Sequence, residues 1–97
     1  MKLTISVITG FDEGKKEQFD DFPISIGRLD DNDFQLSGPC VSRRHCTILY
    51  NDNTFLISDL KSTNGTILNE NSITTTCILS DEDKLIIGEN YLKINFK

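Results

Sequence analysis

Residues 39–58 read PCVSRRHCTILYNDNTFLIS, a stretch that joins a basic motif to a predicted β-hairpin. The runs 46–50 and 54–58 are rich in β-branched and aromatic residues, which favour strands. Residues 51–53 are polar, so we expect them to form a three-residue turn between these strands. The basic motif is then a loop that leads directly into a strand.

Short β-prone segments also occur on both sides of this hairpin. Apolar residues at every second position predict strands at 3–8 and 22–26, with Pro23 at an edge or a strand start. We expect further strands at 34–36, 66–68, 73–79, 85–87 and 91–96, and loops at 10–17, 29–33 and 80–84, the last with room for one helical turn. The Asp-rich loop 29–33 lacks the spacing of an EF-hand, so we interpret it as a solvated turn. Helical spacing is not sustained anywhere. About ten short strands therefore predict an all-β sandwich of two sheets, with function on the loops at one end.

Length and composition limit the possible functions. The 97 residues suffice for one domain, 1–97, with a single core. The net charge of −5 argues against general binding to nucleic acid or an acidic membrane. We find neither an apolar window long enough for a membrane span nor a signal peptide before the first strand. We expect either a free-standing domain or one part of a longer protein.

The cysteines and the histidine argue against metal sites and disulfides. Cys40, Cys46 and Cys77 are odd in number and lack CxxC spacing, and His45 is the only histidine. We therefore expect small buried thiols, no metal and no cofactor. This cysteine usage favours a reducing compartment, cytoplasmic or, in a eukaryote, nuclear.

The arginines are concentrated in two short segments. Arg28, Arg43 and Arg44 are the only three in the chain, and Ser42 and His45 flank the last two. Arginine is suited to forked recognition of carboxylate or phosphate oxygens. Residues 61–66, Lys-Ser-Thr-Asn-Gly-Thr, add hydroxyls, an amide and a tight-turn signal. We interpret these segments as the rims of one phosphate-binding surface.

The order of these motifs resembles that of the forkhead-associated (FHA) domain family. The matching motifs are Gly27-Arg28, Ser42-x-x-His45 and Asn64-Gly65-Thr66-x-x-Asn69, with flanking matches at Asp59-Leu60-x-Ser62 and 79–88. The resemblance extends over residues 3–96. It implies an eleven-stranded, two-sheet β-sandwich of the FHA/SMAD-like type, whose apical loops bind an extended phosphothreonine peptide in Ser/Thr-kinase signalling.

The resemblance also implies a role for each motif residue. Arg28 would pair with the phosphate, Ser42 would donate its hydroxyl to it, and Arg43 would touch the phosphate or the peptide. Thr63 would contact the phosphate through its hydroxyl or its amide, and Asn64 would bind the peptide backbone beyond the phosphothreonine. Four residues are implied to shape the site rather than to touch the ligand: Gly27, His45, Gly65 and Asn69. Of these, His45 would brace the loops from behind.

Three positions depart from the family pattern. Glu70 and Glu82 stand where glycine is frequent, which puts the geometry of two turns in question. Cys40 stands where relatives help to select a residue a few positions after the phosphothreonine. It gives no basis for expecting an acidic preference there.

Two other functions remain open from the sequence. Ser42, His45 and Asp59 are candidates for a hydrolase triad, although the GxSxG elbow is missing. Alternatively, the same fold serves as a phospho-independent assembly module. The main expectation is a monomeric, non-enzymatic domain whose partner is a phosphothreonine-containing protein or peptide.

Overall fold

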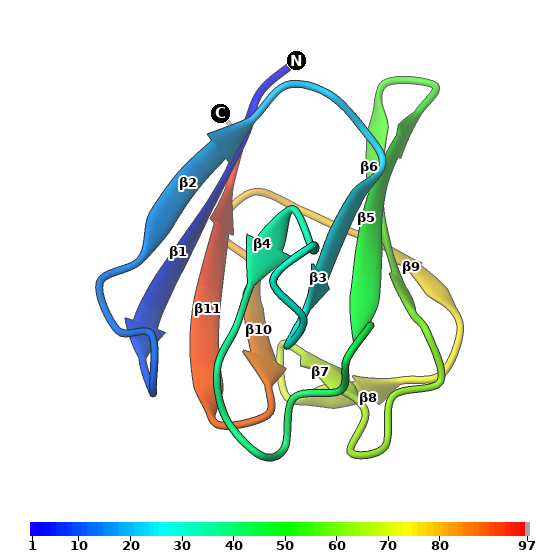
Figure 1. Cartoon of the computed structure of the whole chain (residues 1–97). Helices are drawn as coiled ribbons and strands as arrows, with labels where there is room; N and C mark the ends of the chain where they lie inside the picture. Colours follow the sequence, from blue (N-terminus) through cyan, green and yellow to red (C-terminus); the bar gives the residue numbers. More distant parts are fainter. Residues whose placement is uncertain (97) are drawn as a thin grey trace.

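The computed structural model describes residues 1–96, which form two β-sheets packed face to face (Figure 1). In chain order the strands are β1 (Leu3–Thr9), β2 (Lys16–Phe19), β3 (Ile24–Gly27), β4 (Phe34–Gln35), β5 (Cys46–Asn51), β6 (Thr54–Asp59), β7 (Thr66–Leu68), β8 (Asn71–Ile73), β9 (Thr76–Ile78), β10 (Lys84–Ile87) and β11 (Asn90–Asn95). One sheet has the order β2-β1-β11-β10-β7-β8 and the other β4-β3-β5-β6-β9. All strand pairs described are antiparallel except β3–β4. The predicted all-β sandwich is confirmed.

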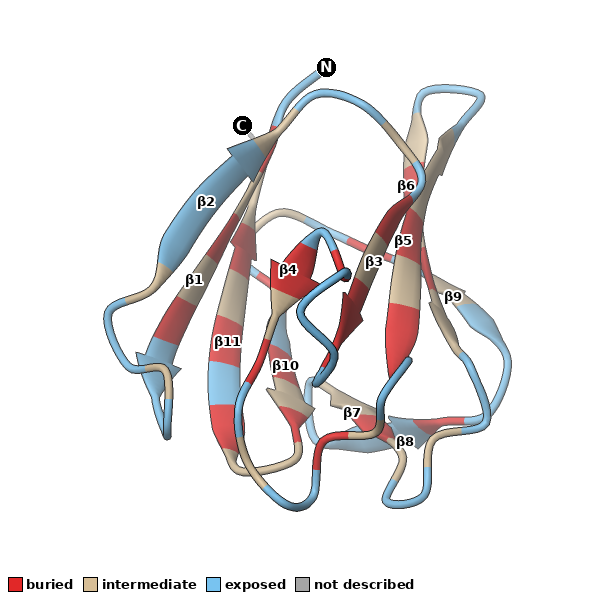
Figure 2. Ribbon diagram, in the orientation of Figure 1, coloured by how far each residue is buried: buried red, intermediate tan, exposed pale blue. Residues whose placement is uncertain are grey.

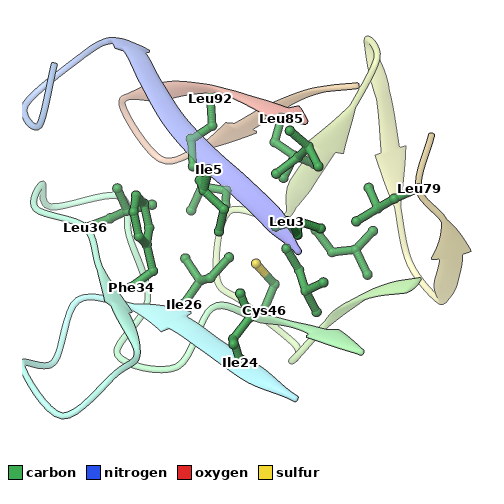
Figure 3. Packing of buried hydrophobic residues seen from close by; sticks show 14 of the residues in the cluster. Leu3, Ile5, Ile24, Ile26, Phe34, Leu36, Cys46, Leu79, Leu85 and Leu92 are labelled. Atoms are coloured by element: carbon green, nitrogen blue, oxygen red, sulfur yellow. The ribbon is translucent and has the colours of Figure 1, made fainter. Parts of the chain in front are cut away.

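The core lies between the two sheets (Figure 3). Leu3 and Ile5 of β1 face Ile24 and Ile26 of β3, and all four side chains are buried. Intervening residues on β1 are only half-buried, because successive side chains of a strand point to opposite faces. The alternation read from the sequence therefore identifies the inner face correctly.

Two strand assignments from the sequence need correction. Residues 16–19 form β2, which pairs with β1 at the sheet edge, whereas 10–17 was expected to be a loop. An exposed edge strand tolerates charged side chains, so its sequence lacks apolar alternation. Residues 73–79 do not form one strand: β8 belongs to one sheet and β9 to the other. Residues 1–96 contain no helix, so none is available to cross a membrane.

Two hairpin turns also differ from the expected ones. Asn51 pairs with Thr54, so the β5–β6 turn has only two residues, Asp52 and Asn53, both with positive φ (50° and 60°). This is the backbone of a type I′ turn, which matches the twist of the strands. Likewise Ile87 pairs with Asn90, so residues 88–89 form the β10–β11 turn rather than 89–90.

The departures at Glu70 and Glu82 leave both turns intact, but each glutamate adopts positive φ (73° and 71°). Glu82 is the third residue of a hydrogen-bonded turn in which Asp83 N donates to Ser80 O at 3.1 Å. Positive φ at that position is typical of a type II turn and favours glycine. The glutamates therefore occupy backbone conformations that are costly for residues with a Cβ.

Glu82→Gly is expected to raise the free energy of unfolding by about 1 kcal/mol, because glycine adopts positive φ without strain. For a domain of this size the melting temperature should rise by about 4–8 °C, measurable by thermal denaturation. Asp52→Gly is the matched control, since aspartate tolerates positive φ better than glutamate and the change should be a few tenths of a kcal/mol at most. A lower melting temperature for Glu82→Gly would contradict the assignment of strain.

The two ends of the sandwich differ in what they carry. Thr4 pairs with Asn95, so the chain termini lie close together at one end. The β10–β11 turn lies at the other end of β11, where Glu89 Oε2 accepts a hydrogen bond from Cys40 N at 3.1 Å. Figure 1 shows the loops that follow β4 and β6 at this second end, away from the labelled termini.

Candidate functional site

Three loops, residues 28–33, 36–45 and 60–65, converge at the end of the sandwich opposite the termini, and much of their surface is exposed (Figure 2). Backbone hydrogen bonds join them: Arg28 N donates to Ser42 O at 3.0 Å, and Leu60 N donates to His45 O at 2.9 Å. Between them lies an open pocket of about 510 Å³. The pocket is lined by Arg28, Pro39, Cys40, Val41, Ser42, Arg43, Arg44, Lys61, Thr63 and Asn64. All five residues predicted to contact a ligand therefore lie in one pocket.

His45 is fully buried behind this pocket and connects two of its loops. Its Nδ1 accepts a hydrogen bond from the backbone N–H of Ser42 at 3.0 Å, so the neutral ring carries its proton on Nε2. Nε2 then donates to Gly65 O at 2.8 Å. Burial lowers the pKa of His45, while the Gly65 carbonyl and the charge of Asp59 oppose this shift in part. The ring is thus placed as a brace between loops, with both nitrogens already occupied.

Ser42 and Thr63 are connected directly across the pocket. The N–H of Thr63 donates to Ser42 Oγ at 2.9 Å. A hydroxyl has one donor and two acceptor sites, so Ser42 keeps its own proton for a ligand. The amide of Thr63 is engaged in this structure, which leaves its side-chain hydroxyl as the group free to contact a ligand.

Arg28 follows directly after β3 and is held in place through one edge of its guanidinium. Its Nε donates to Val41 O at 3.1 Å, and its carbonyl accepts from Gln35 Nε2 at 3.0 Å. Within residues 1–96 the two Nη groups have no hydrogen-bond or ion-pair partner. They form a fork that is positioned by Nε and free to bind two oxygens of an oxyanion.

Gly27 is required by a close backbone approach. A Cβ at this position would overlap the carbonyl oxygen of Arg43 and come within 2.9 Å of Asn32 Nδ2. The same Asn32 amide donates to Arg43 O at 2.9 Å and to Leu29 O at 2.8 Å. Glycine thus allows the loop carrying Ser42 and Arg43 to lie directly against the end of β3. Asn32 is 7% exposed, and its bracing role was not predicted from the sequence.

Asp59 holds the third loop in shape, a role that differs from the two the sequence suggested for it, a flanking motif residue and a member of a hydrolase triad. Its carboxylate accepts from Ser62 N at 3.0 Å, Ser62 Oγ at 2.6 Å and Thr66 Oγ1 at 2.7 Å. Burial opposes ionisation, but these hydrogen bonds and the nearby His45 outweigh it and lower the pKa of Asp59. The Asp-x-x-Ser spacing is typical of such a local side-chain turn and was the available signal.

Asn64 and Gly65 have separate roles in the same turn. Asn64 Nδ2 donates to Cys40 O at 3.3 Å, across the pocket, which leaves the amide oxygen and a second N–H free. Only Gly65 adopts positive φ (81°), and a Cβ there would meet nothing closer than Ser72 Oγ at 3.6 Å. Gly65 is therefore needed for its backbone conformation rather than for space.

Asn69, predicted to support the site, lies outside the pocket lining. Its Nδ2 donates to Asp83 Oδ1 at 2.8 Å and its Oδ1 accepts from Lys84 N at 2.9 Å. These bonds fasten the β7–β8 turn (φ 48° at Asn69) to the start of β10. These hydrogen bonds therefore support the turn after β7 and not the pocket directly.

Four cationic side chains line the pocket and no carboxylate does. Lys61 and Arg44 were expected at the rims of this surface, without a contact of their own to the ligand. Arg44 Nη2 forms an ion pair with Asp31 Oδ2 at 2.7 Å, the one ion pair found within residues 1–96. The side chains of Arg28, Arg43 and Lys61 have no such partner in this part of the chain. The pocket is therefore strongly cationic although the chain has a net charge of −5.

The proposed hydrolase triad is not assembled. His45 Nδ1 faces the backbone N–H of Ser42 rather than its hydroxyl, and Nε2 faces Gly65 O. Asp59 is hydrogen-bonded to Ser62 and Thr66. His45 can therefore not take a proton from Ser42 Oγ in this arrangement.

In residues 1–96 no group of three or more His, Cys, Asp or Glu could hold a metal ion. The expectation of buried thiols holds for Cys46 alone, because Cys40 is exposed at the pocket and Cys77 is half-buried.

Comparison with known proteins supports the family resemblance. A family model described as FHA domain matches residues 24–88. The transcriptional regulatory protein EmbR of Mycobacterium tuberculosis is 39% identical over 65 residues, which cover 67% of this chain and 17% of EmbR. A solved structure from an analysis of phosphothreonine-dependent FHA domain interactions has a TM-score of 0.89 and 29% identity, covering 100% of this chain and 98% of that one.

EmbR is also similar in three dimensions. Its structure in complex with a low-affinity phosphopeptide has a TM-score of 0.87 and 26% identity, covering 97% of this chain and 24% of that one. The chain belongs to the FHA domain family, and the resemblance seen in the sequence is confirmed. Members of this family are interaction modules that recognise phosphorylated motifs through arginine clusters. The chain spans only a small part of the length of EmbR.

Proposed function

We propose that residues 1–97 form a single FHA domain that binds extended phosphothreonine peptides in Ser/Thr-kinase-linked signalling. The observation that carries this proposal is the convergence of Arg28, Ser42 and Thr63 in a cationic pocket without carboxylates. The solved EmbR complex supports it, because that relative is bound to a phosphopeptide. The ligand is a phosphothreonine-containing protein or peptide.

The proposed contacts follow from the donors that are free in the pocket. The Arg28 fork binds two phosphate oxygens, and the hydroxyls of Ser42 and Thr63 donate to the phosphate. A phosphate carries roughly −1.5 to −2 charges at pH 7. Each charge-assisted hydrogen bond is worth about 1.5–3 kcal/mol. Asn64 binds the peptide backbone with its amide oxygen and with the N–H that does not donate to Cys40 O. Arg43 lies beside the phosphate.

The first point of this proposal is that the domain acts by binding rather than by catalysis. It also acts as a monomer and does not bind nucleic acid. The absence of a Ser–His relay supports the first point, since both nitrogens of His45 are bonded to backbone groups. The three cysteines are free thiols, which supports a cytoplasmic location.

A phosphothreonine peptide is expected to bind several-fold more tightly than its phosphoserine counterpart, and the unmodified peptide negligibly. The phosphothreonine methyl can contact the nonpolar atoms of the exposed lining residue Pro39, and burying one such group is worth about 0.8 kcal/mol. Phosphothreonine is also stiffer at χ1 and loses less freedom on binding. Calorimetric titration of the three matched peptides measures both differences.

The alternatives give different results in the same titration. Equal affinity for both phosphopeptides would reduce the pocket to a generic anion site. Equal affinity for all three peptides would favour the phospho-independent assembly module and overturn the proposed function.

A further inference from the structure

We propose that Lys61 and Arg43 form a second anion subsite, which binds another negatively charged group of the peptide beside the phosphothreonine phosphate. The inference rests on the function proposed above and specifies its ligand class. That ligand is a phosphopeptide carrying an acidic side chain or a second phosphorylated residue close to the phosphothreonine.

The charge balance of the pocket is the first observation. Of the four cations lining it, only Arg44 is neutralised, by Asp31 at 2.7 Å. Three positive charges, on Arg28, Arg43 and Lys61, therefore face one phosphate of roughly −1.5 to −2. About one positive charge remains without a counterpart when a single phosphate is bound. A second anion on the ligand would complete the charge balance.

The backbone of Lys61 is the second observation. Lys61 has a φ of 58°, which glycine adopts freely and which lysine rarely does. Among the residues of positive φ other than glycine, it alone lines the pocket. Its side chain is exposed and has no hydrogen bond or ion pair within residues 1–96, so it does not hold the fold together. Backbone strain of this kind clusters at ligand-binding sites, and Lys61 is the strained residue whose side chain is a cation at an anion pocket.

The position of the two cations is the third observation. Arg43 directly follows Ser42, and Lys61 precedes Thr63 by two residues. Ser42 and Thr63 are joined by the 2.9 Å hydrogen bond across the pocket. The carbonyl of Arg43 is fixed by Asn32 at 2.9 Å, while its side chain is free. The two cations therefore flank the proposed phosphate contacts from opposite loops, and an anion bound by both lies next to the phosphate.

The test compares three kinds of peptide that share one phosphothreonine. The first has uncharged flanks, the second has glutamate at each flanking position in turn, and the third has a second phosphothreonine at those positions. We expect at least one position to tighten binding by about two- to fivefold, as exposed charge pairs allow. A gain from glutamate identifies an acidic residue as sufficient. A gain from phosphate alone identifies a doubly phosphorylated ligand.

Variants separate this subsite from general attraction. The quantity compared is the ratio of the affinity for the peptide with the added anion to the affinity for the peptide with uncharged flanks. Lys61→Gly removes the cation and the backbone strain, so the melting temperature should rise while this affinity ratio falls to about one. Arg43→Ala should lower the same ratio. Glu70→Gly relieves strain outside the pocket, and Lys93→Ala removes a charge from β11, so both controls should keep the ratio.

The possible failures are distinguishable. If no phosphopeptide binds, the proposed function and the second subsite are both overturned. If the singly phosphorylated peptide binds but no added anion tightens binding, only the second subsite is overturned. A ratio that stays unchanged in Lys61→Gly would also overturn it.

Discussion

Arg28→Ala is expected to lower the affinity for a phosphothreonine peptide by about a hundredfold or more while leaving the fold intact. The substitution removes a charged fork from which two hydrogen bonds to phosphate are expected, worth about 3 kcal/mol or more together. The side chain is exposed and holds only the carbonyl of Val41, so little stability should be lost. Calorimetric titration with the phosphopeptide, together with thermal denaturation, measures both effects.

Arg44 provides the matched control for this experiment. It lines the same pocket, but its guanidinium already donates to Asp31 at 2.7 Å and to Asn32 at 3.2 Å. Arg44→Ala should therefore weaken binding by less than about threefold. Arg28→Lys keeps the charge but loses the fork, and should remain well below the wild-type affinity. Normal affinity in a folded Arg28→Ala protein would remove the central contact from the proposed function.

His45→Ala is expected to destabilise the fold by about 3 kcal/mol, with weaker binding as a secondary result. The substitution leaves a cavity and removes partners from the partly buried N–H of Ser42 and carbonyl of Gly65. For a domain of this size the melting temperature should fall by more than about 10 °C. An unchanged melting temperature with lost peptide binding would instead place His45 among the ligand contacts.

The same residue predicts how stability depends on pH. Burial lowers the pKa of His45 in the folded state, so below about pH 6.5 the unfolded chain binds the proton more readily. Wild-type stability should therefore fall as the pH drops from 7 towards 5. His45→Ala lacks this group, and His45 is the only histidine, so the stability difference between the two proteins should shrink. Denaturant titrations at several pH values measure that difference, and a gap that widens as the pH falls would contradict the lowered pKa of His45.

The sequence predicted the architecture because the evidence for it is local. Alternation at Leu3 and Ile5 identified a buried strand face, and the Gly27-Arg28 pair marked the end of another strand. The lengths of the turns could not be predicted in the same way. The β5–β6 turn has two residues because Asn51 pairs with Thr54, and that pairing depends on the register between the two strands. Likewise β2 is defined by its neighbour β1 rather than by its own composition.

The candidate site was predictable as a set of residues but not as a geometry. The motif order pointed to Arg28, Ser42 and Asn64, yet their convergence depends on contacts between distant segments. Ser42 and Thr63 are joined across 21 residues by one hydrogen bond. The conformation of Lys61 arises from the same folding of the loop, and nothing in the local sequence signals positive φ at a lysine. The convergence of the loops and the conformation of Lys61 depend on burial and on long-range hydrogen bonds. A short sequence motif predicts neither of these.

The placement of the termini has a practical and architectural consequence. Because Thr4 pairs with Asn95 and the pocket lies beyond the far end of β11, attachment points and binding loops are separated by the length of that strand, about 20 Å. Anchoring the domain by either terminus to a sensor chip leaves its ligand-facing end directed into solution. A fluorescent reporter fused to either terminus would likewise lie away from the bound peptide. The same geometry would suit tandem arrangements, in which several such domains are joined through their termini and present their binding loops side by side.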